Sequence, residues 1–167
     1  MRKLTLIVLL IASTFTTYAQ RDMLSIGVHG GATVGDYSDA YSANTGLDVS
    51  YLHGISDKFY VGAAASFTNY FSDSFDEGGR RVEFDDKQLL PVAGSIRISP
   101  FSFRSVLVGA DIGYAVGLND GNDGGFYASP RITYLLADFQ LYAGYRLIAL
   151  DEDDLTSVQL GVAYTLW

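Results

Sequence analysis

The stretch of sequence that decides the fold is residues 157–167, which read SVQLGVAYTLW. Apolar residues occupy every second position, and small or polar residues lie between them. A strict period of two is typical of a β-strand whose two faces meet different surroundings. The apolar face comprises Val158, Leu160, Val162, Tyr164 and Leu166. We therefore predict a strand with one apolar face that runs to the end of this chain.

Seven further stretches alternate in the same way, and clusters of Gly, Asp, Asn and Ser separate them. They are residues 25–34, 46–51, 59–68, 90–99, 106–117, 127–136 and 140–147. No stretch after Gln20 shows a helical period. The sequence therefore predicts an all-β fold of eight strands.

The segments between these strands alternate in length. Short connections follow the second, fourth and sixth strands, at residues 53–58, 100–104 and 137–139. Longer, acidic connections follow the first, third, fifth and seventh strands, at residues 36–43, 71–87, 118–125 and 149–156. Transmembrane barrels have this asymmetry, with tight periplasmic turns and long extracellular loops. An even number of strands places both chain ends on the periplasmic side.

Residues 1–19 are predicted to be a secretory signal peptide. Arg2 and Lys3 form a short basic start, an apolar run covers residues 4–12, and Ala19 ends the segment. The run is too short for the roughly 20 residues that a membrane-spanning helix needs. We expect cleavage after Ala19 and one barrel domain over residues 20–167. The alternative is a retained N-terminal anchor.

The charge of the mature chain excludes one class of partner. Loss of Arg2 and Lys3 from the 11 Lys and Arg leaves 9 against 19 Asp and Glu, a formal charge of −10. Nucleic-acid binding rests on basic patches, so nucleic acid is not an expected partner. The remaining lysines are Lys58 and Lys87, whereas a soluble sheet normally covers its wet face with Lys and Glu. The chain has no Cys and hence no disulfide.

The second face of each predicted strand indicates its environment. It consists of Gly, Ala, Ser and Tyr with a few charged residues. Small residues suit the lumen of a narrow barrel, where side chains interdigitate. We therefore predict a closed, antiparallel, up-and-down, eight-stranded transmembrane β-barrel. A soluble, lipocalin-like barrel is the alternative.

Charged residues on the lumen face are expected to pair, because buried charges persist only when they are paired. Counting around the connections places Asp111 across from Arg131, and Arg131 across from Arg146. The predicted network, which would plug the lumen, comprises Asp48, Arg97, Asp111, Arg131 and Arg146. The alternative is a path for ions or protons lined by the same residues.

Aromatic residues gather toward the ends of the predicted strands, as they do at the two interfaces of a membrane. On the apolar face these are Tyr51, Phe59, Phe67, Phe126, Tyr145 and Tyr164, and in the short turns they are Phe101, Phe103 and Phe139.

The mature chain resembles the small outer-membrane β-barrel family, the OmpA/OmpX-like eight-stranded type of Gram-negative bacteria. The ending Tyr18-Ala19-Gln20 is similar to signal peptides of exported Bacteroidetes proteins. The most specific part of the resemblance is a C-terminal signal read by the barrel assembly machinery. Its positions hold Gln159, Gly161, Val162, Tyr164 and Leu166. Leu166 fills the usual aromatic position and Trp167 follows it, so either residue is a candidate for the operative end.

This resemblance implies an integral protein of the cell outer membrane, in contact with outer-membrane lipid. A structural or adhesive role at the cell surface is expected, and a small pore or channel is the alternative. In the longest loop, residues 82–84 (VEF) are expected to extend the third and fourth strands above the membrane. An exposed edge there could bind a surface protein partner.

No catalytic residue, metal site or cofactor is predicted. Nucleophilic catalysis needs a His beside a Ser and an acid, but the two histidines, His29 and His53, stand near no distinctive Ser. His29 is expected to pack in the lumen, and His53 to lie at the first short turn. The acidic runs at 120–124 and 151–154 are expected to be solvated loops rather than calcium sites. A lipid-modifying enzyme is the less favoured alternative.

Overall fold

The computed structural model describes residues 22–72, 75–77, 80–82, 86–101, 105–119, 124–150 and 154–166. The predicted signal peptide, Phe103 and Trp167 lie outside these ranges. Within them, no helix is long and apolar enough to cross a membrane.

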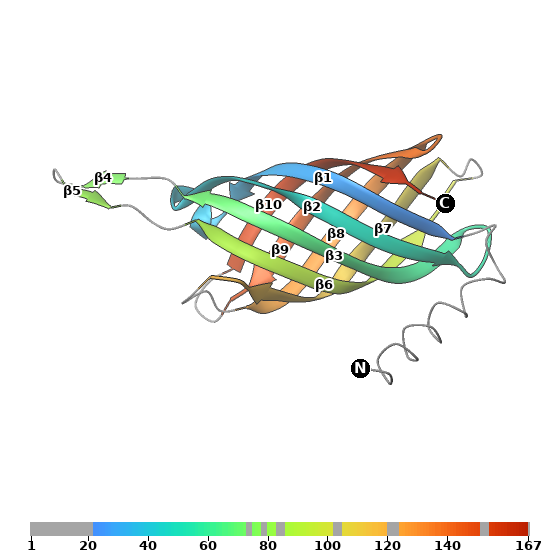
Figure 1. Cartoon of the computed structure of the whole chain (residues 1–167), viewed down its shortest axis with the longest axis horizontal. Coiled ribbons are helices and arrows are strands. Elements are labelled where there is room, and N and C mark those ends of the chain that lie inside the picture. The colour runs from blue at the N-terminus through green and yellow to red at the C-terminus, as the bar shows by residue number, and fades with distance from the viewer. Residues whose placement is uncertain are drawn as a thin grey trace, which may run out of the picture.

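Eight long strands form one closed antiparallel barrel. They are β1 (Met23–Val34), β2 (Tyr41–Gly54), β3 (Phe59–Ser72), β6 (Lys87–Ile98), β7 (Val106–Gly117), β8 (Gly125–Leu136), β9 (Phe139–Ala149) and β10 (Asp154–Thr165). Each of these strands pairs with the next one along the chain, and β1 pairs with β10 to close the ring. Figure 1 shows the strands tilted about a common axis. The predicted up-and-down, eight-stranded barrel is confirmed.

Several strands are longer than the hydropathy pattern predicts. β2 begins at Tyr41 rather than at residue 46, and β10 begins at Asp154 rather than at residue 157. Ladder pairing uses the backbone, so polar residues can continue a strand: Thr45 pairs with Gly30 of β1 and donates a side-chain hydrogen bond to the carbonyl of His29 (2.9 Å). The alternation of apolar and polar residues therefore marks the middle of a strand, where the two faces differ, and not the full length of the strand.

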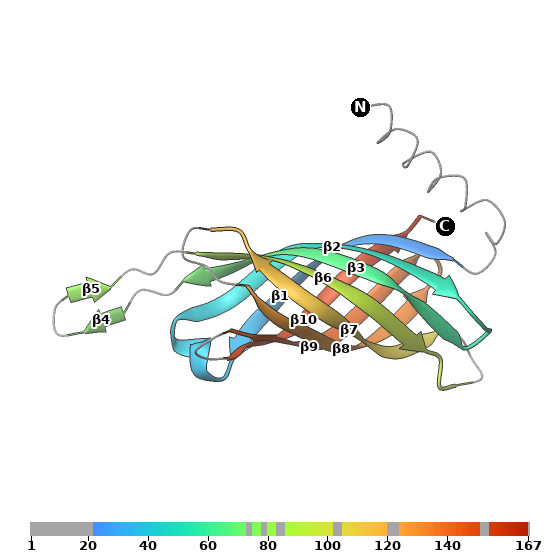
Figure 2. The ribbon, with the colours of Figure 1, turned by 90° about the horizontal axis from the view of Figure 1, so that it is seen from below.

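The two ends of the barrel differ. At one end, the connections at 55–58 and 137–138 are tight, and Ala137 adopts a positive φ of 51°. We term this the short-turn end. At the opposite end, the 3-10 helix η2 (Asp36–Asp39) follows β1, and the short strands β4 (Phe75–Glu77) and β5 (Arg80–Val82) lie between β3 and β6 in sequence. Figures 1 and 2 show β4 and β5 projecting beyond the barrel, and we term this the hairpin end.

The projecting hairpin corrects one expectation. Val82 does not extend the barrel strands but pairs with Phe75 in a separate two-stranded sheet, and residues 83–85 lie outside the described ranges. The register places Asp76 opposite Arg81 and Glu77 opposite Arg80. The three paired positions of β4 and β5 thus form a short ladder of their own, which does not continue the ladder between β3 and β6.

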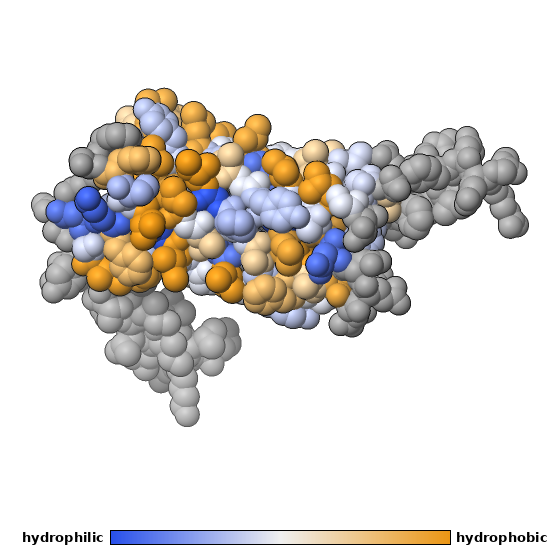
Figure 3. Space-filling model, turned by 180° about the vertical axis from the view of Figure 1, so that it is seen from behind, coloured by the Kyte–Doolittle hydropathy of each residue, from blue (hydrophilic) through white to orange (hydrophobic). Residues whose placement is uncertain are grey.

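The outer surface of the barrel is apolar on every strand. Exposed side chains from the eight strands include Ile26, Leu47, Phe67, Val92, Ile112, Ile132, Leu141 and Leu160. Figure 3 shows apolar side chains spread over one side of this surface. Aromatic rings lie at both ends: Phe139 and Tyr164 meet edge to face at the short-turn end, and Phe126 is exposed near the hairpin end.

An apolar cluster fills the lumen toward the hairpin end. Its buried members are Tyr70, Leu89, Ala93, Ala115, Tyr127, Ile148 and Leu155. Tyr37 of η2 and Tyr41 pack against this cluster, and the rings of Tyr41 and Tyr70 are 6.4 Å apart. The interior therefore changes along the axis from apolar near the hairpin end to polar and charged near the middle.

The outer surface gives a direct test of contact with hydrocarbon. Leu160, halfway along β10, is 67 % exposed. Leu160→Arg should lower the free energy of unfolding in lipid vesicles by about 2–4 kcal/mol, because a charged side chain at the bilayer midplane is costly. Leu118→Arg, just past the hairpin end of β7, should cost less than about 1 kcal/mol. Denaturant titrations in vesicles measure both, and equal small losses would show that the outer face does not meet hydrocarbon.

Candidate functional site

The first charged group in the lumen is built around Asp111 of β7. Its carboxylate accepts hydrogen bonds from Ser95 Oγ (2.6 Å) and from Arg97 Nη2 (2.6 Å), both of β6. Arg131 of β8 forms an ion pair with the second carboxylate oxygen, also at 2.6 Å. The Asp111 side chain is fully buried between the two guanidinium groups. This arrangement satisfies the requirement that a buried charge be paired and hydrogen-bonded.

The register between strands differs from the predicted one. Asp111 stands opposite Ser129 and not Arg131, and Arg131 stands opposite Gly144 and not Arg146. The β7–β8 pairs centre on position 120, whereas a pairing of Asp111 with Arg131 needs position 121. The β8–β9 pairs centre between positions 137 and 138, whereas a pairing of Arg131 with Arg146 needs a centre one residue later. Each difference of one residue shifts the partner by two positions. Arg131 still reaches Asp111 because a long side chain spans the diagonal between neighbouring strands. Arg146 joins a different group.

The second charged group is built around Asp48 of β2. Its carboxylate lies 2.8 Å from Nδ1 of His29 and also accepts a hydrogen bond from the Tyr142 hydroxyl. Arg146 approaches the other carboxylate oxygen at 4.0 Å. The Arg146 guanidinium also donates to Thr68 Oγ1 and to Ser66 Oγ of β3 (3.3 Å). This group thus ties together β1, β2, β3 and β9 across the lumen.

Aromatic rings connect the two groups. The guanidinium of Arg131 lies over the ring of Tyr142 (4.8 Å), whose hydroxyl is bonded to Asp48. The guanidinium of Arg146 lies over the ring of Tyr127 at 5.6 Å. Cation–π contacts of this kind add stability when the cation is desolvated. All five predicted lumen charges therefore belong to one connected interior.

Glycine makes room for the large polar side chains. A Cβ added to Gly161 would lie 2.2 Å from the Tyr142 ring, and one added to Gly46 would lie 2.5 Å from the His29 ring. Both glycines face their aromatic neighbour across a strand pair. The absence of a side chain at these two positions is therefore what lets Tyr142 and His29 reach Asp48.

One arrangement in this group has the geometry of a catalytic triad. Asp48 holds Nδ1 of His29, and Nε2 of His29 lies 3.3 Å from Thr68 Oγ1. The His29 side chain and Thr68 are both 0 % exposed, and Thr68 Oγ1 also accepts a hydrogen bond from the Arg146 guanidinium. A nucleophile needs access to a substrate carbonyl. The three residues therefore pack inside the lumen, where a substrate cannot reach the Thr68 hydroxyl.

A smaller polar cluster lies outside the lumen at the short-turn end. Asp22 accepts a hydrogen bond from the Tyr51 hydroxyl (2.6 Å) and lies 2.7 Å from Nδ1 of His53. His53 was expected in a turn, but it pairs with Val61 inside the longer β2 strand. The cluster ties the start of the described chain to β2.

The base of the hairpin is held by Asp86. Its carboxylate accepts hydrogen bonds from Asn69 Nδ2 (3.0 Å) and from the backbone N–H of Ser72 (3.1 Å). These bonds to the charged form, that from Asn69 first, hold the pKa of the Asp86 carboxyl below its ordinary value. Asn119 donates to the Asp86 carbonyl (3.1 Å), so β3, β6 and β7 meet at this residue.

The residues of the predicted C-terminal signal divide between the two faces of β10. Gln159 points into the lumen and donates to Asn44 Oδ1 (3.2 Å), and Gly161 lies beneath Tyr142. The outward residues are Val162, Tyr164 and Leu166. Trp167 lies outside the described ranges.

Metal ligation finds no support in the part of the chain that the structure describes. It contains no group of three or more His, Asp or Glu side chains placed to hold an ion. Residues 120–123 and 151–153 of the two acidic runs lie outside that part.

The contributions of uncharged residues were not evident from the sequence. Ser66, Thr68, Ser95 and Tyr142 supply much of the hydrogen bonding to the charged groups. Alternation predicts that each of them faces inward, but not which charge it meets. The one available signal is the pairing of a large residue with a glycine, as for Tyr142 and Gly161.

Comparison with known proteins identifies the fold and nothing finer. No family model and no curated protein sequence matches the chain. The structure of the Yersinia pestis outer membrane protein Ail in a phospholipid nanodisc superposes with a TM-score of 0.58 at 16% identity, covering 87% of this chain and 99% of that one. The N-terminal β-barrel domain of Pseudomonas aeruginosa OprF gives 0.53 at 14% identity, covering 88% and 98%. A de novo designed transmembrane β-barrel gives 0.53 at 12% identity, covering 90% and 100%.

The Asp111 group predicts a large effect of a nearly isosteric change. Asp111→Asn leaves two buried guanidinium groups without their carboxylate and should lower the free energy of unfolding by about 3–5 kcal/mol. Asp138→Asn, in the exposed β8–β9 turn, should change it by less than about 0.5 kcal/mol. Urea unfolding of both variants in the same lipid measures the difference. A similar loss in the two variants would show that Asp111 holds no buried charge pair.

Proposed function

We propose that this chain is an integral outer-membrane protein with a closed lumen and a structural or adhesive role at the cell surface. The observation that carries the proposal is the distribution of side chains around the wall. Every strand presents apolar residues outward, while the interior holds paired charges. That inversion of a soluble barrel suits a hydrocarbon environment.

The orientation in the membrane follows from the connections. Tight turns in such barrels face the periplasm and long loops face outward. The short-turn end is thus periplasmic, and η2 and the hairpin are at the cell surface. Export by a cleaved signal peptide in a Gram-negative, Bacteroidetes-type cell is part of the proposal, as is insertion by the assembly machinery through Gln159, Gly161 and the outward residues up to Leu166 or Trp167.

Two features of the lumen support closure. Asp48 and Arg146 face each other from strands that are not neighbours, Asp111 pairs with arginines of both adjacent strands, and the apolar cluster lies between these groups and the hairpin end. An eight-stranded barrel has little more interior than its own side chains fill. A plug of this kind favours a structural role for the five charged residues over a path for ions.

The candidate interaction surface is the hairpin end. One of the similar barrels, Ail, is named as an attachment invasion locus protein, and it has been solved with the heparin analogue sucrose octasulfate (TM-score 0.51, 18% identity). In the present chain the long loops are rich in Asp and Glu. Their charge suits a basic protein partner rather than a polyanion. No catalytic role is part of the proposal, because the Asp48–His29–Thr68 arrangement is buried.

Electrical recording separates a closed barrel from a pore. The purified protein in a planar lipid bilayer should show no conductance above that of the protein-free membrane, since paired side chains block the lumen. Asp111→Asn should not create steady channels, because the apolar cluster stays in place. Steady openings in the wild-type protein whose size changes on Asp111→Asn would establish the pore instead.

Deletion of the hairpin separates a surface role from a purely architectural one. Removal of residues 74–85 leaves Asp86 and its bonds to Asn69 and Ser72 intact, so the shortened chain should still fractionate with the outer membrane. Attachment of cells to cultured epithelial cells should fall to the level of cells that lack the protein. A chain with residues 74–85 replaced by Gly and Ser at equal length is the control for loop length. Unchanged attachment, or recovery of the wild-type protein from the soluble periplasm, would contradict the proposal.

A further inference from the structure

A proline interrupts the barrel wall between β3 and β6. The two strands pair regularly up to Ala65 with Val92 and again from Thr68 with Leu89. The positions between them, Ser66 and Phe67 on β3, have no paired residue on β6. Pro91 is the residue that would stand opposite Ser66, and it is almost completely buried.

The missing pairs follow from the chemistry of proline. Proline has no N–H, so it cannot donate to the carbonyl on the facing strand. At this register the group that loses its donor is the carbonyl of Ser66. Pro91 remains paired with Ala115 of β7 on its other side, so the strand itself persists. An unpaired carbonyl within a barrel wall costs several kcal/mol unless another donor reaches it.

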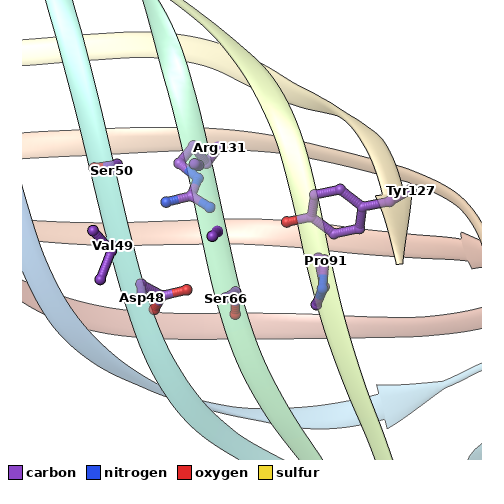
Figure 4. A pocket seen from close by; sticks show the side chains of 9 residues that line it. Asp48, Val49, Ser50, Ser66, Pro91, Tyr127 and Arg131 are labelled. Atoms are coloured by element: carbon purple, nitrogen blue, oxygen red, sulfur yellow. The ribbon is translucent and has the colours of Figure 1, made fainter. Parts of the chain in front are cut away.

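A small cavity lies at this interruption. Ser66 and Pro91 line it from the wall, and Asp48, Tyr127 and Arg131 line it from the lumen (Figure 4). It leaves about 10 Å³ for the centre of a water-sized molecule. That room is close to the minimum that holds one water, so larger ligands do not fit.

Two further polar groups lie at the cavity. Nε of Arg131 is buried and makes no hydrogen bond to any described residue. The Asp48 oxygen that does not meet His29 and Tyr142 lies 4.0 Å from Arg146, beyond hydrogen-bond distance. An unmet donor, the Ser66 carbonyl and a carboxylate oxygen that can accept a further hydrogen bond therefore meet at one cavity. A buried polar group without a partner costs about 1–3 kcal/mol, so the arrangement favours an occupant.

We propose that this cavity binds one water molecule, which accepts from Arg131 Nε–H and donates to the Asp48 carboxylate and the Ser66 carbonyl. Water supplies two donors and accepts through its oxygen, which matches the three groups. The Arg131 guanidinium repels a cation, and the carboxylate with the carbonyl repels an anion. The bound water completes the β3–β6 wall and joins the Asp48 group to the Asp111 group. This site is independent of the role proposed for the hairpin.

A second proline provides a matched comparison. Ser129 and Pro130 of β8 have no paired residues on β9, although Pro130 pairs with Ala110 of β7. The backbone defect is thus the same as at Pro91. Pro130 does not line the cavity, so repair of its ladder should leave the bound water in place.

Nuclear magnetic resonance of the intact barrel in lipid nanodiscs tests the site. Magnetisation transfer from water to the Arg131 Nε–H proton should be strong in the wild-type protein. Pro91→Val restores a donor to the Ser66 carbonyl and draws β3 and β6 together, so the transfer should fall at least severalfold. Pro130→Val should leave it at the wild-type level.

Each outcome decides the proposal. Absence of transfer in the wild-type protein would refute the bound water, and this measurement requires no variant to fold. Full transfer in Pro91→Val would show that the wall interruption is not part of the site. Equal loss in both valine variants would assign the effect to general tightening of the barrel and would also overturn the proposal.

Discussion

Backbone pairing is the constraint on which the rest of this structure depends. In hydrocarbon no water is available for a free N–H or C=O, and each unpaired group costs several kcal/mol. The pairing of β1 with β10, from Ser25 with Thr165 to Val34 with Thr156, removes the two edges that an open sheet would leave. Closure also fixes the width of the lumen, because eight strands leave room for little besides side chains. The polar interior follows from that geometry.

A narrow lumen forces large and small residues to complement one another across strands. Tyr142 occupies the space over Gly161, and His29 occupies the space over Gly46. Arg131 stands opposite Gly144, where no side chain competes with it. The charged groups then lie close enough for Asp111 to hold two guanidinium groups at 2.6 Å. Steric room and charge pairing are therefore two aspects of one packing solution.

Strand number, closure and the inward placement of the five charges were predictable from the sequence, because alternation is a local property that each strand carries by itself. Register was not, because it depends on the centre of each loop, and one residue of error moved the partner of Asp111 from Ser129 to Arg131. Contacts across the lumen were further out of reach. Thr68 and Tyr142 meet Arg146 and Asp48 from strands that are not neighbours, and alternation gives the face of a residue but not its height.

The two prolines show where the wall and the interior depend on each other. In most sheets a proline argues against a central strand, since it removes a ladder donor. Here each proline lacks a paired residue on one neighbouring strand and keeps its paired residue on the other. Pro91 lies beside Asp48 and Arg131 at the one water-sized cavity described above, where polar groups of the lumen can compensate a backbone group of the wall. In the proposed arrangement, the buried charges stabilise the barrel wall through the bound water as well as one another. A lumen emptied of these charges to make a channel would lose that contribution, so the proposed closure and the stability of the wall favour the same arrangement.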